Sequence, residues 1–376
     1  MAERGGCPLE KVRAMLGAIT GRALPEGLPA RLRDALDFAL VDAVPIDPGV
    51  IHNNRLFRLR GEDGRDLVAK VYYRDGIGRL EREFGSFRFL RGRSTECVPR
   101  PYLTDEAEQY AVYSFEPGRT KTPAMLSVAE LAAIGRLAAE LHRFRRGEPG
   151  DHVPRAFAED TLAGRIAYLR RRLAACLAAG AAPEAYPELR AVVAEVDVAG
   201  ALERLIAAAT AGVGGAQLAE RVPEEHLRLN PGDFAPHNII ARPDGTLCAI
   251  DFEYAGWDDA AALPASFLTA EQSAGLTKEQ RDAFLGSYRA ACGVPEDALV
   301  RFEPLLRLIE AGQILTSLSL MTPAHVARKR FAGHFDLAVH LTQRRRMIEE
   351  GVRRTFGERQ SHPRCDAILD GEVKFP

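Results

Sequence analysis

Residues 230–238 read Asn230-Pro231-Gly232-Asp233-Phe234-Ala235-Pro236-His237-Asn238, and Asp251-Phe252-Glu253 follow after a short apolar segment. That segment consists of two apolar-rich runs around Pro243-Asp244-Gly245, which is the pattern of a β-hairpin with a tight turn. Pairing across such a hairpin places Asn238 opposite residue 249, 250 or 251. The sequence therefore predicts that Asn238 and Asp251 share the open end of the hairpin.

Three oxygen-rich side chains at this spacing could hold a divalent cation and a hydroxyl nucleophile together. Magnesium prefers oxygen ligands and is usually bound by one or two protein carboxylates together with substrate phosphates. Asn238 and Asp251 suit the ligand role, which leaves Asp233 to orient an attacking hydroxyl group. Taken singly, each aspartate could instead be a turn residue or a helix cap. The combined spacing favours a metal site next to a catalytic base.

The composition agrees with a soluble enzyme. The chain has 376 residues, 46% hydrophobic content and a formal net charge of −2, which suits a large core divided between two lobes or domains. A protein that binds nucleic acid over its whole surface is normally clearly basic, so this balance argues against that class. The six cysteines form no CxxC pair, and we find neither a secretion signal nor an apolar run of membrane-spanning length. These features predict a cytoplasmic protein with reduced thiols and no membrane partner.

The first third of the chain contains a second predicted hairpin. Residues 1–45 are expected to form a helical lead-in, with the first β-rich segment after Pro45. Two strands at 55–59 and 66–73 flank a turn rich in glycine and acidic residues. Lys70 lies inside the second strand, where a lysine could be either an exposed edge residue or a functional one.

A helix is predicted next, because apolar residues between 80 and 90 recur at helical spacing. At about 100° per residue, Glu83 lies close to the apolar face of this helix. A carboxylate turned inward needs a partner, since burying it unpaired costs free energy. Lys70 is the nearest upstream candidate. The alternatives for Glu83 are an intrahelical pair with Arg79 and a solvated position on the helix flank.

With these elements in order, the chain resembles the aminoglycoside phosphotransferase and choline kinase superfamily, whose members phosphorylate small molecules on a protein-kinase-like fold. The resemblance covers roughly residues 48–345 and is most specific at 227–259. It depends on the aspartate, asparagine and aspartate of the catalytic loop and metal motif, and on a strand lysine followed by an inward glutamate. By this resemblance, Asp233 would be the catalytic aspartate, Asn238 and Asp251 would bind Mg²⁺, and Lys70, held by Glu83, would bind the phosphates of ATP.

The resemblance extends to the segment between the lobes. The run Val112–Gly118 looks like the family's interlobe linker, so the Ser114 carbonyl and the Glu116 amide would contact adenine. Two features depart from the pattern. Pro231 stands where many relatives have histidine, and the segment 49–54 offers one glycine in place of a glycine-rich nucleotide loop. Asn54 could contact phosphate through its side chain or amide, or could belong to a plain turn.

The predicted fold is α+β and bilobal, with an N-terminal lobe built on an antiparallel sheet and a mainly helical C-terminal lobe. ATP is expected in the cleft between them. The expected divisions are a lead-in at 1–45, a nucleotide-binding lobe at 46–113, a linker at 114–118, a catalytic and substrate-binding lobe at 119–354 and an irregular tail at 355–376.

The predicted activity is transfer of the γ-phosphate of ATP to a hydroxyl group of a sugar, an amino alcohol or an antibiotic-like acceptor. Protein substrates are less favoured, because no Ala-Pro-Glu signature follows Asp251. The alternative is a catalytically inactive, kinase-like protein that binds nucleotide for regulation. A monomer or homodimer without nucleic-acid partners is expected.

The acceptor is expected against helices of the C-terminal lobe, at 160–220 and 300–350. Residues 328–354 contain eight Lys or Arg side chains against three acids, which disfavours a polycationic acceptor nearby. These charges indicate either a solvated helix face or a site for an anionic or sugar-like acceptor. Trp257 could belong to the core or stack against the acceptor.

Overall fold

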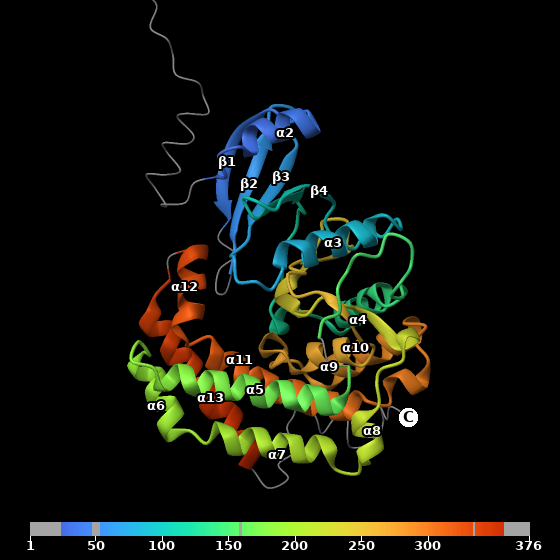
Figure 1. Ribbon diagram of the computed structural model, residues 1–376. Helices are drawn as coiled ribbons and strands as arrows, with labels where there is room; N and C mark the ends of the chain where they lie inside the picture. The colour runs from blue at the N-terminus through green and yellow to red at the C-terminus, as the bar shows by residue number, and fades with distance from the viewer. Residues whose placement is uncertain (1–23, 47–52, 158–159, 334, 357–376) are drawn as a thin grey trace, which may run out of the picture.

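The computed structural model describes residues 24–46, 53–157, 160–333 and 335–356. The N-terminal lobe is a five-stranded antiparallel sheet in the order β1-β2-β3-β5-β4, accompanied by two helices (Figure 1). Its elements are α2 (Leu28–Leu36), β1 (Leu40–Ile46), β2 (Arg55–Gly61), β3 (Asp66–Val71), α3 (Arg79–Arg91), β4 (Pro101–Asp105) and β5 (Tyr110–Ser114).

The predicted hairpin of the N-terminal lobe is formed by β2 and β3. Lys70 pairs with Leu56 on β2 and with Ala111 on β5, so it lies in the central strand of the sheet. Its side chain cannot be that of an edge residue, and only 6% of the residue is exposed. The strand lysine is therefore buried inside the lobe.

The expected helical lead-in at 1–45 is wrong at its C-terminal end. Leu40–Ile46 form β1, which pairs with β2 and begins before Pro45. Leu40 and Ala43 are buried while Val41 and Val44 are exposed, as suits a strand with one covered face. Proline is tolerated there because β1 is at the edge of the sheet. The helix α2 agrees with the prediction, and residues 1–23 lie outside the described residues.

The two faces of the sheet belong to different cores. Along β5, Tyr110 and Val112 pack with α2, whereas Ala111 and Tyr113 pack with α3 and the C-terminal lobe. The link is aromatic, since the Phe87 ring centroid lies 5.0 Å from that of Phe252. The apolar residues of α3 belong to the core of the larger lobe. Helix α3 therefore fixes the position of Glu83 relative to both lobes.

The C-terminal lobe is mainly helical (Figure 1). Two short antiparallel strand pairs, β6 with β9 and β7 with β8, carry the sequence motifs. Helix α11 lies at the centre and packs against α5, α7, α9 and α13. The elements are α4 (Val128–Leu141), α5 (Leu162–Ala181), α6 (Pro187–Glu195), α7 (Val198–Thr210), α8 (Gly215–Ala219), β6 (Leu227–Asn230), β7 (Ile239–Ala241), β8 (Leu247–Ala249), β9 (Gly256–Asp259), α9 (Ala262–Thr269), α10 (Lys278–Ala291), α11 (Phe302–Ser319), α12 (Pro323–Ala332) and α13 (Leu337–Phe356).

Trp257 belongs to the core. It is 1% exposed, its ring centroid lies 5.5 Å from that of Phe89, and its indole nitrogen donates to Asp151 at 3.0 Å. Stacking of Trp257 on an acceptor is therefore excluded. At the C-terminus, α13 continues to Phe356, and the rest of the predicted tail lies outside the described residues. Within the described ranges, no helix combines the length and apolar character needed to cross a membrane.

Candidate active site

The loop that carries Asp233 begins where β6 ends, at Asn230. Gly232 has a φ of 84°, and a Cβ there would lie 2.6 Å from the Tyr254 Cβ, so this turn requires glycine. The Asn230 side chain supports the turn by accepting a hydrogen bond from the Gly232 amide at 2.9 Å and donating to Asp258 at 3.1 Å. Asn230 thus gives the loop the side-chain hydrogen bonds that Pro231 cannot make.

Asn238 and Asp251 lie at the open end of the β7–β8 hairpin, as the sequence predicted. Ile239 pairs with Ala249, and the Ile250 amide donates to the Asn238 carbonyl at 2.9 Å. The Asn238 side-chain nitrogen donates to the Asp233 carbonyl at 2.9 Å, which connects the loop that carries Asp233 to the hairpin. Asp251 follows with a φ of 64°, a left-handed conformation that aspartate tolerates better than most residues.

Lys70 bridges two carboxylates from different lobes. Its Nζ donates to Glu83 Oε2 at 2.5 Å and to Asp251 Oδ1 at 2.6 Å. Burial would lower the pKa of Lys70, but the charges of Asp251 and Glu83 outweigh it and raise this pKa. Burial raises the pKa of Glu83 to about 7, against the opposing charge of Lys70. Burial would also raise the pKa of Asp251, but Lys70 lowers it. Glu83 therefore faces inward and pairs with Lys70, not with Arg79.

A second buried network surrounds Glu253, which is 1% exposed. Arg79 Nη1 donates to its carboxylate at 2.6 Å, and Arg79 also pairs with Asp75 at 2.6 Å. The Asn54 side chain donates to the other carboxylate oxygen. Burial, followed by the charge of Asp251, raises the pKa of Glu253. Sequence reasoning missed the roles of Arg79 and Glu253, although the position of Glu253 two residues after Asp251 was a usable signal.

His237 was also missed as a site residue. Its Nε2 lies 3.5 Å from Asp233 Oδ2, and its Nδ1 is buried without a partner among the described residues. Burial would lower the pKa of His237, but its hydrogen bond with Asp233 and the charges of Asp233 and Asp251 raise it. The i,i+4 spacing from Asp233 could have indicated this contact.

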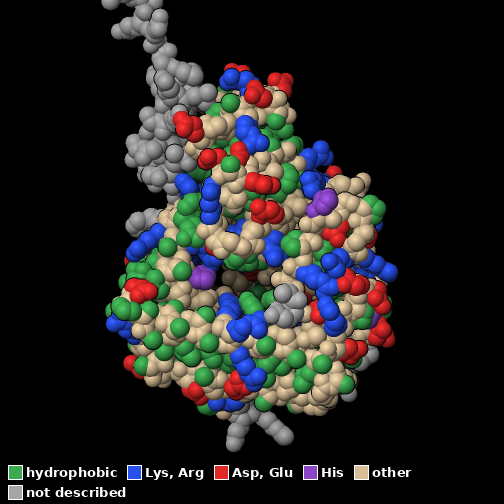
Figure 2. All heavy atoms as spheres, in the orientation of Figure 1, with side chains coloured by type: hydrophobic (Ala, Val, Ile, Leu, Met, Phe, Trp, Pro, Cys, Tyr) green, Lys and Arg blue, Asp and Glu red, His purple; other side chains and the backbone are tan. Residues whose placement is uncertain are grey.

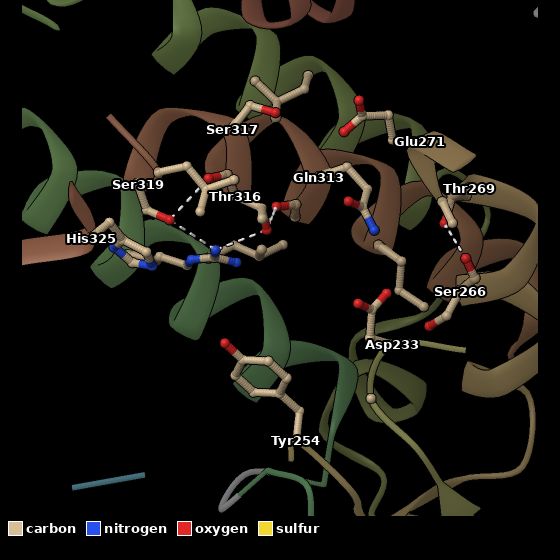
Figure 3. Close-up of a pocket in the computed structure, with 18 of the residues that line it drawn as sticks. Asp233, Tyr254, Ser266, Thr269, Glu271, Gln313, Thr316, Ser317, Ser319 and His325 are labelled. Atoms are coloured by element: carbon tan, nitrogen blue, oxygen red, sulfur yellow. Dashed lines mark hydrogen bonds between the residues drawn. The ribbon is translucent and has the colours of Figure 1, made fainter. Parts of the chain in front are cut away.

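A cavity of about 1470 Å³ lies between the lobes and continues among the helices of the C-terminal lobe. Asp233, His237, Asp251 and Glu253 line one part of it. Figure 2 shows this hollow beneath the smaller lobe, with Lys and Arg side chains along its rim. In Figure 3, the Asp233 side chain lies near Gln313 of α11 and Ser266 of α9. A small molecule in the cavity could therefore reach Asp233.

Comparison with known proteins gives the family. The sequence model of the phosphotransferase enzyme family matches residues 43–302. This chain belongs to that family. A search of curated proteins gives no match. The predicted superfamily and the phosphotransferase activity typical of it are thereby confirmed, as are the small-molecule kinase class and the kinase-like bilobal fold.

Solved structures share the fold of this phosphotransferase. An ethanolamine kinase from Plasmodium vivax has a TM-score of 0.59 at 15% identity, covering 93% of this chain and 95% of that one. Spectinomycin phosphotransferase APH(9)-Ia, in complex with ADP and spectinomycin, has a TM-score of 0.58 at 9% identity, covering 88% and 98%. Choline kinase LicA from Streptococcus pneumoniae has a TM-score of 0.55 at 14% identity, covering 87% and 98%. At these identities, the likeness establishes the fold and not the acceptor.

The donor set of the phosphotransferase fits Mg²⁺. The Asn238 side-chain nitrogen is engaged by the Asp233 carbonyl, which leaves the side-chain oxygen for a ligand role. Asp251 uses Oδ1 for Lys70, and 36% of its side chain remains exposed. One amide oxygen and one carboxylate, completed by substrate phosphates and water, form the kind of site that Mg²⁺ occupies.

The other residues predicted to contact the nucleotide are Asn54, Ser114 and Glu116, and their side chains already form hydrogen bonds within the protein. Both polar ends of the Asn54 side chain are used by the protein, since Asn54 accepts from the Tyr73 amide at 3.3 Å and donates to Glu253. One side-chain N–H of Asn54 and its backbone amide remain as donors for a phosphate contact. Ser114 Oγ donates to Glu116 at 2.5 Å, and Arg242 donates to Glu116 at 2.8 Å, which fixes the linker. Adenine binding by Ser114 and Glu116 stays a prediction, and residues 47–52 lie outside the described residues.

Proposed function

We propose that this phosphotransferase moves the γ-phosphate of ATP to a hydroxyl group of a small molecule, with Asp233 as the catalytic aspartate. The single observation that supports this assignment is the Lys70–Asp251 contact across the lobes, beside a cavity that also receives Asp233. A strand lysine, a metal-binding aspartate and a catalytic aspartate in one cleft are the parts that phosphoryl transfer uses.

Each residue has a stated task. Asp233 accepts or orients the proton of the acceptor hydroxyl, and Lys70 holds the nucleotide phosphates while Glu83 positions Lys70. Asn238 and Asp251 would hold Mg²⁺, which neutralises charge on the phosphate oxygens when bound. Positioning can lower the barrier by about 7–11 kcal/mol, so a preorganised network of this kind is the main catalytic resource.

The function is tested with the full chain, Mg²⁺, ATP and a panel of hydroxylated metabolites. Acceptor-dependent ADP release, together with a product heavier by one phosphoryl group in the mass spectrum, supports the proposal. ATP binding without transfer across a broad panel would favour the regulatory alternative. The Asp233→Asn variant is the control, since it should bind ATP without releasing ADP at the wild-type rate.

We also propose a cytoplasmic location. The four cysteines of the described ranges, Cys97, Cys176, Cys248 and Cys292, are free thiols. Free thiols agree with a reducing compartment. Whether the phosphotransferase is a monomer or a homodimer stays a prediction, which size-exclusion chromatography with light scattering would test.

A further inference from the structure

Arg172 lies at the end of the cavity formed by α5, α11 and α12. Hydrogen bonds hold its guanidinium group, but no carboxylate among the described residues neutralises its charge. Arg172 Nη2 donates to Thr316 Oγ1 at 2.9 Å and to Ser319 Oγ at 3.4 Å, as the dashed lines in Figure 3 mark. Both hydroxyls donate in turn to α11 carbonyls, so they offer lone pairs to the guanidinium. Within the part of the chain that the structure describes, Arg172 has no carboxylate partner.

Two other arginines of α5 form ion pairs with acids. Arg165 pairs with Asp258, and Arg170 pairs with Glu203 at 2.6 Å. Arg172 therefore stands out on its own helix, because it lines the cavity and keeps its positive charge. A cation that served only to hold the helices together would be expected to pair with an acid in the same way.

Two further arginines of the cavity wall are buried. Arg328 and Arg344 are 6% and 3% exposed, and both line the cavity. Arg328 pairs with Asp75 at 3.1 Å, but Asp75 is shared with Arg79. Arg344 pairs with Glu271 at 3.1 Å. The Nε atoms of Arg328 and Arg344 are buried without partners among the described residues. Buried polar groups are usually satisfied, so these two call for an explanation.

His325 lies at the same end of the cavity. It lies beside Thr316 and Ser319 in Figure 3 and lines the same cavity. Burial, followed by the charges of Arg328 and Arg172, lowers the pKa of His325 to about 3. A positive potential in a partly desolvated pocket attracts an anion.

Polar side chains connect this end with the catalytic aspartate. Gln313, Thr316, Ser317 and Ser319 of α11 line the cavity, and Gln313 is the one near Asp233 (Figure 3). From Gln313 to Ser319 the helix rises about 9 Å, which is the length of a sugar with one substituent. Hydroxyls and an amide along that length suit a molecule with several hydroxyl groups.

We propose that the acceptor is a polyhydroxylated small molecule carrying an anionic group, which Arg172 binds together with Arg328 while a hydroxyl group faces Asp233. This inference rests on the proposed phosphotransferase function for the reaction, but the anion site itself can be tested separately. A carboxylate and a phosphate monoester share the required chemistry, since both accept hydrogen bonds from a guanidinium.

The first test measures anion binding without turnover. The melting temperature of the full chain is compared in sodium phosphate and in sodium chloride of equal ionic strength, with Mg²⁺ and the non-hydrolysable analogue AMP-PNP filling the nucleotide site. Phosphate should raise the melting temperature of the wild type and of Arg170→Gln equally, and should raise that of Arg172→Gln by less than half as much. Arg170→Gln is the matched control, because it removes the same charge from the exposed face of α5. An equal shift in all three proteins, or no shift in the wild type, would overturn the proposal.

The second test compares sorbitol, gluconate and sorbitol 6-phosphate as acceptors in the ADP-release assay. One of the anionic compounds should exceed sorbitol in kcat/KM, and which one does so distinguishes the carboxylate from the phosphate monoester. Arg172→Gln should lower that kcat/KM about tenfold to a hundredfold through KM, as expected for a lost hydrogen bond to a charged group. Preference for sorbitol, or an unchanged kcat/KM in Arg172→Gln, counts against the anion site.

The two proposals fail in different ways. Loss of all ADP release, with Arg172-dependent phosphate binding retained, would refute phosphoryl transfer and leave the anion site standing. Transfer to neutral acceptors, with phosphate binding independent of Arg172, would refute the anion site and leave the transfer function standing.

Discussion

The two ends of the cavity differ in how far their buried cations are paired with acids. At the catalytic end, each buried cation has two acids: Lys70 contacts Glu83 and Asp251, and Arg79 contacts Asp75 and Glu253. At the far end, Arg172 contacts only hydroxyls among the described residues, and the acid that Arg328 contacts, Asp75, is shared with Arg79. The protein neutralises the first end by itself, whereas the second end keeps positive charge.

This difference agrees with two separate tasks, catalysis at one end of the cavity and ligand recognition at the other. Catalysis gains from groups that are fixed before the substrate arrives, and a fully paired network is fixed in this way. Recognition of a charged ligand requires a charge that no opposite charge of the protein already neutralises. Substitutions that remove charge, or a hydrogen-bonding group, from either end of the cavity test this difference.

The largest expected effect is on turnover at the catalytic end. Asp233→Asn removes the proposed proton acceptor and should lower kcat by about 10²–10⁴-fold, the usual contribution of a general base. Nucleotide affinity should hardly change, because Lys70, Asn238 and Asp251 are untouched. Single-turnover kinetics and titration with an ATP analogue would measure both quantities. Asp244→Asn, at the exposed turn between β7 and β8, is the control and should behave as the wild type. A normal kcat in Asp233→Asn would contradict the assigned role.

Lys70→Met should cost the most stability. It leaves Glu83 and Asp251 as neighbouring carboxylates in a buried site, and breaking a buried ion pair on one side costs about 3–5 kcal/mol. Urea unfolding would measure the loss. The matched control is Lys278→Met, whose lysine pairs with Asp282 on the surface of α10 at 2.9 Å. That change should cost no more than about 1 kcal/mol.

A second substitution makes the Lys70 prediction sharper. Adding Glu83→Gln to Lys70→Met removes one of the two stranded carboxylates and should recover part of the lost stability. If the double variant is as unstable as the sum of its parts, the two residues do not act as a pair.

Much of the catalytic end was predictable from local sequence patterns. Cross-strand pairing in the predicted hairpin placed Asn238 beside Asp251. The helical spacing of apolar residues indicated that Glu83 faces Lys70. The Arg79–Glu253 pair was not predictable in this way, because its partners are 174 positions apart and no repeating pattern relates them.

The far end was less predictable for the same physical reason. Its charge was visible as an excess of basic residues at 328–354, but their burial was not. Arg328, Lys329 and Arg344 are buried, whereas the Arg346 side chain is 80% exposed, so the segment combines a cavity wall with a solvated face. The strand β1 was missed because a short edge strand depends on its pairing with β2.

Lys329 offers a pH-dependent test of the far end. Burial, followed by the charges of Arg344 and Arg328, lowers the pKa of Lys329 to about 8 from 10.5. Below pH 8 the lysine is charged in both the folded and the unfolded chain, and the folded state bears the full penalty. Between pH 8 and 10.5 the unfolded chain binds more protons, so the contribution of Lys329 to stability improves as the pH rises.

Lys329→Met should therefore stabilise the protein at pH 7, by up to about 3 kcal/mol. The advantage should shrink towards pH 10, where the wild-type lysine is neutral in the fold. Urea unfolding of both proteins at several pH values gives the difference directly, which cancels the titration of all other groups. An advantage that stays constant with pH would show that packing against Phe335, and not charge, sets the effect.

The smallest expected effect concerns the hydroxyl that holds Arg172. Thr316→Val removes the 2.9 Å contact and leaves Arg172 with Ser319. The free energy of unfolding should fall by about 0.5–1.5 kcal/mol, the usual net value of one hydrogen bond. Thr210→Val on α7 is the control, because its hydroxyl bonds only to helix carbonyls at Ile206 and Ala207. Both changes should affect stability similarly, but only Thr316→Val should raise KM for an anionic acceptor, since a guanidinium that is free to move binds its ligand with a larger loss of side-chain entropy. An equal KM in both variants would mean that Arg172 is held in place by packing alone, and that its two hydroxyl contacts do not prepare it for a ligand.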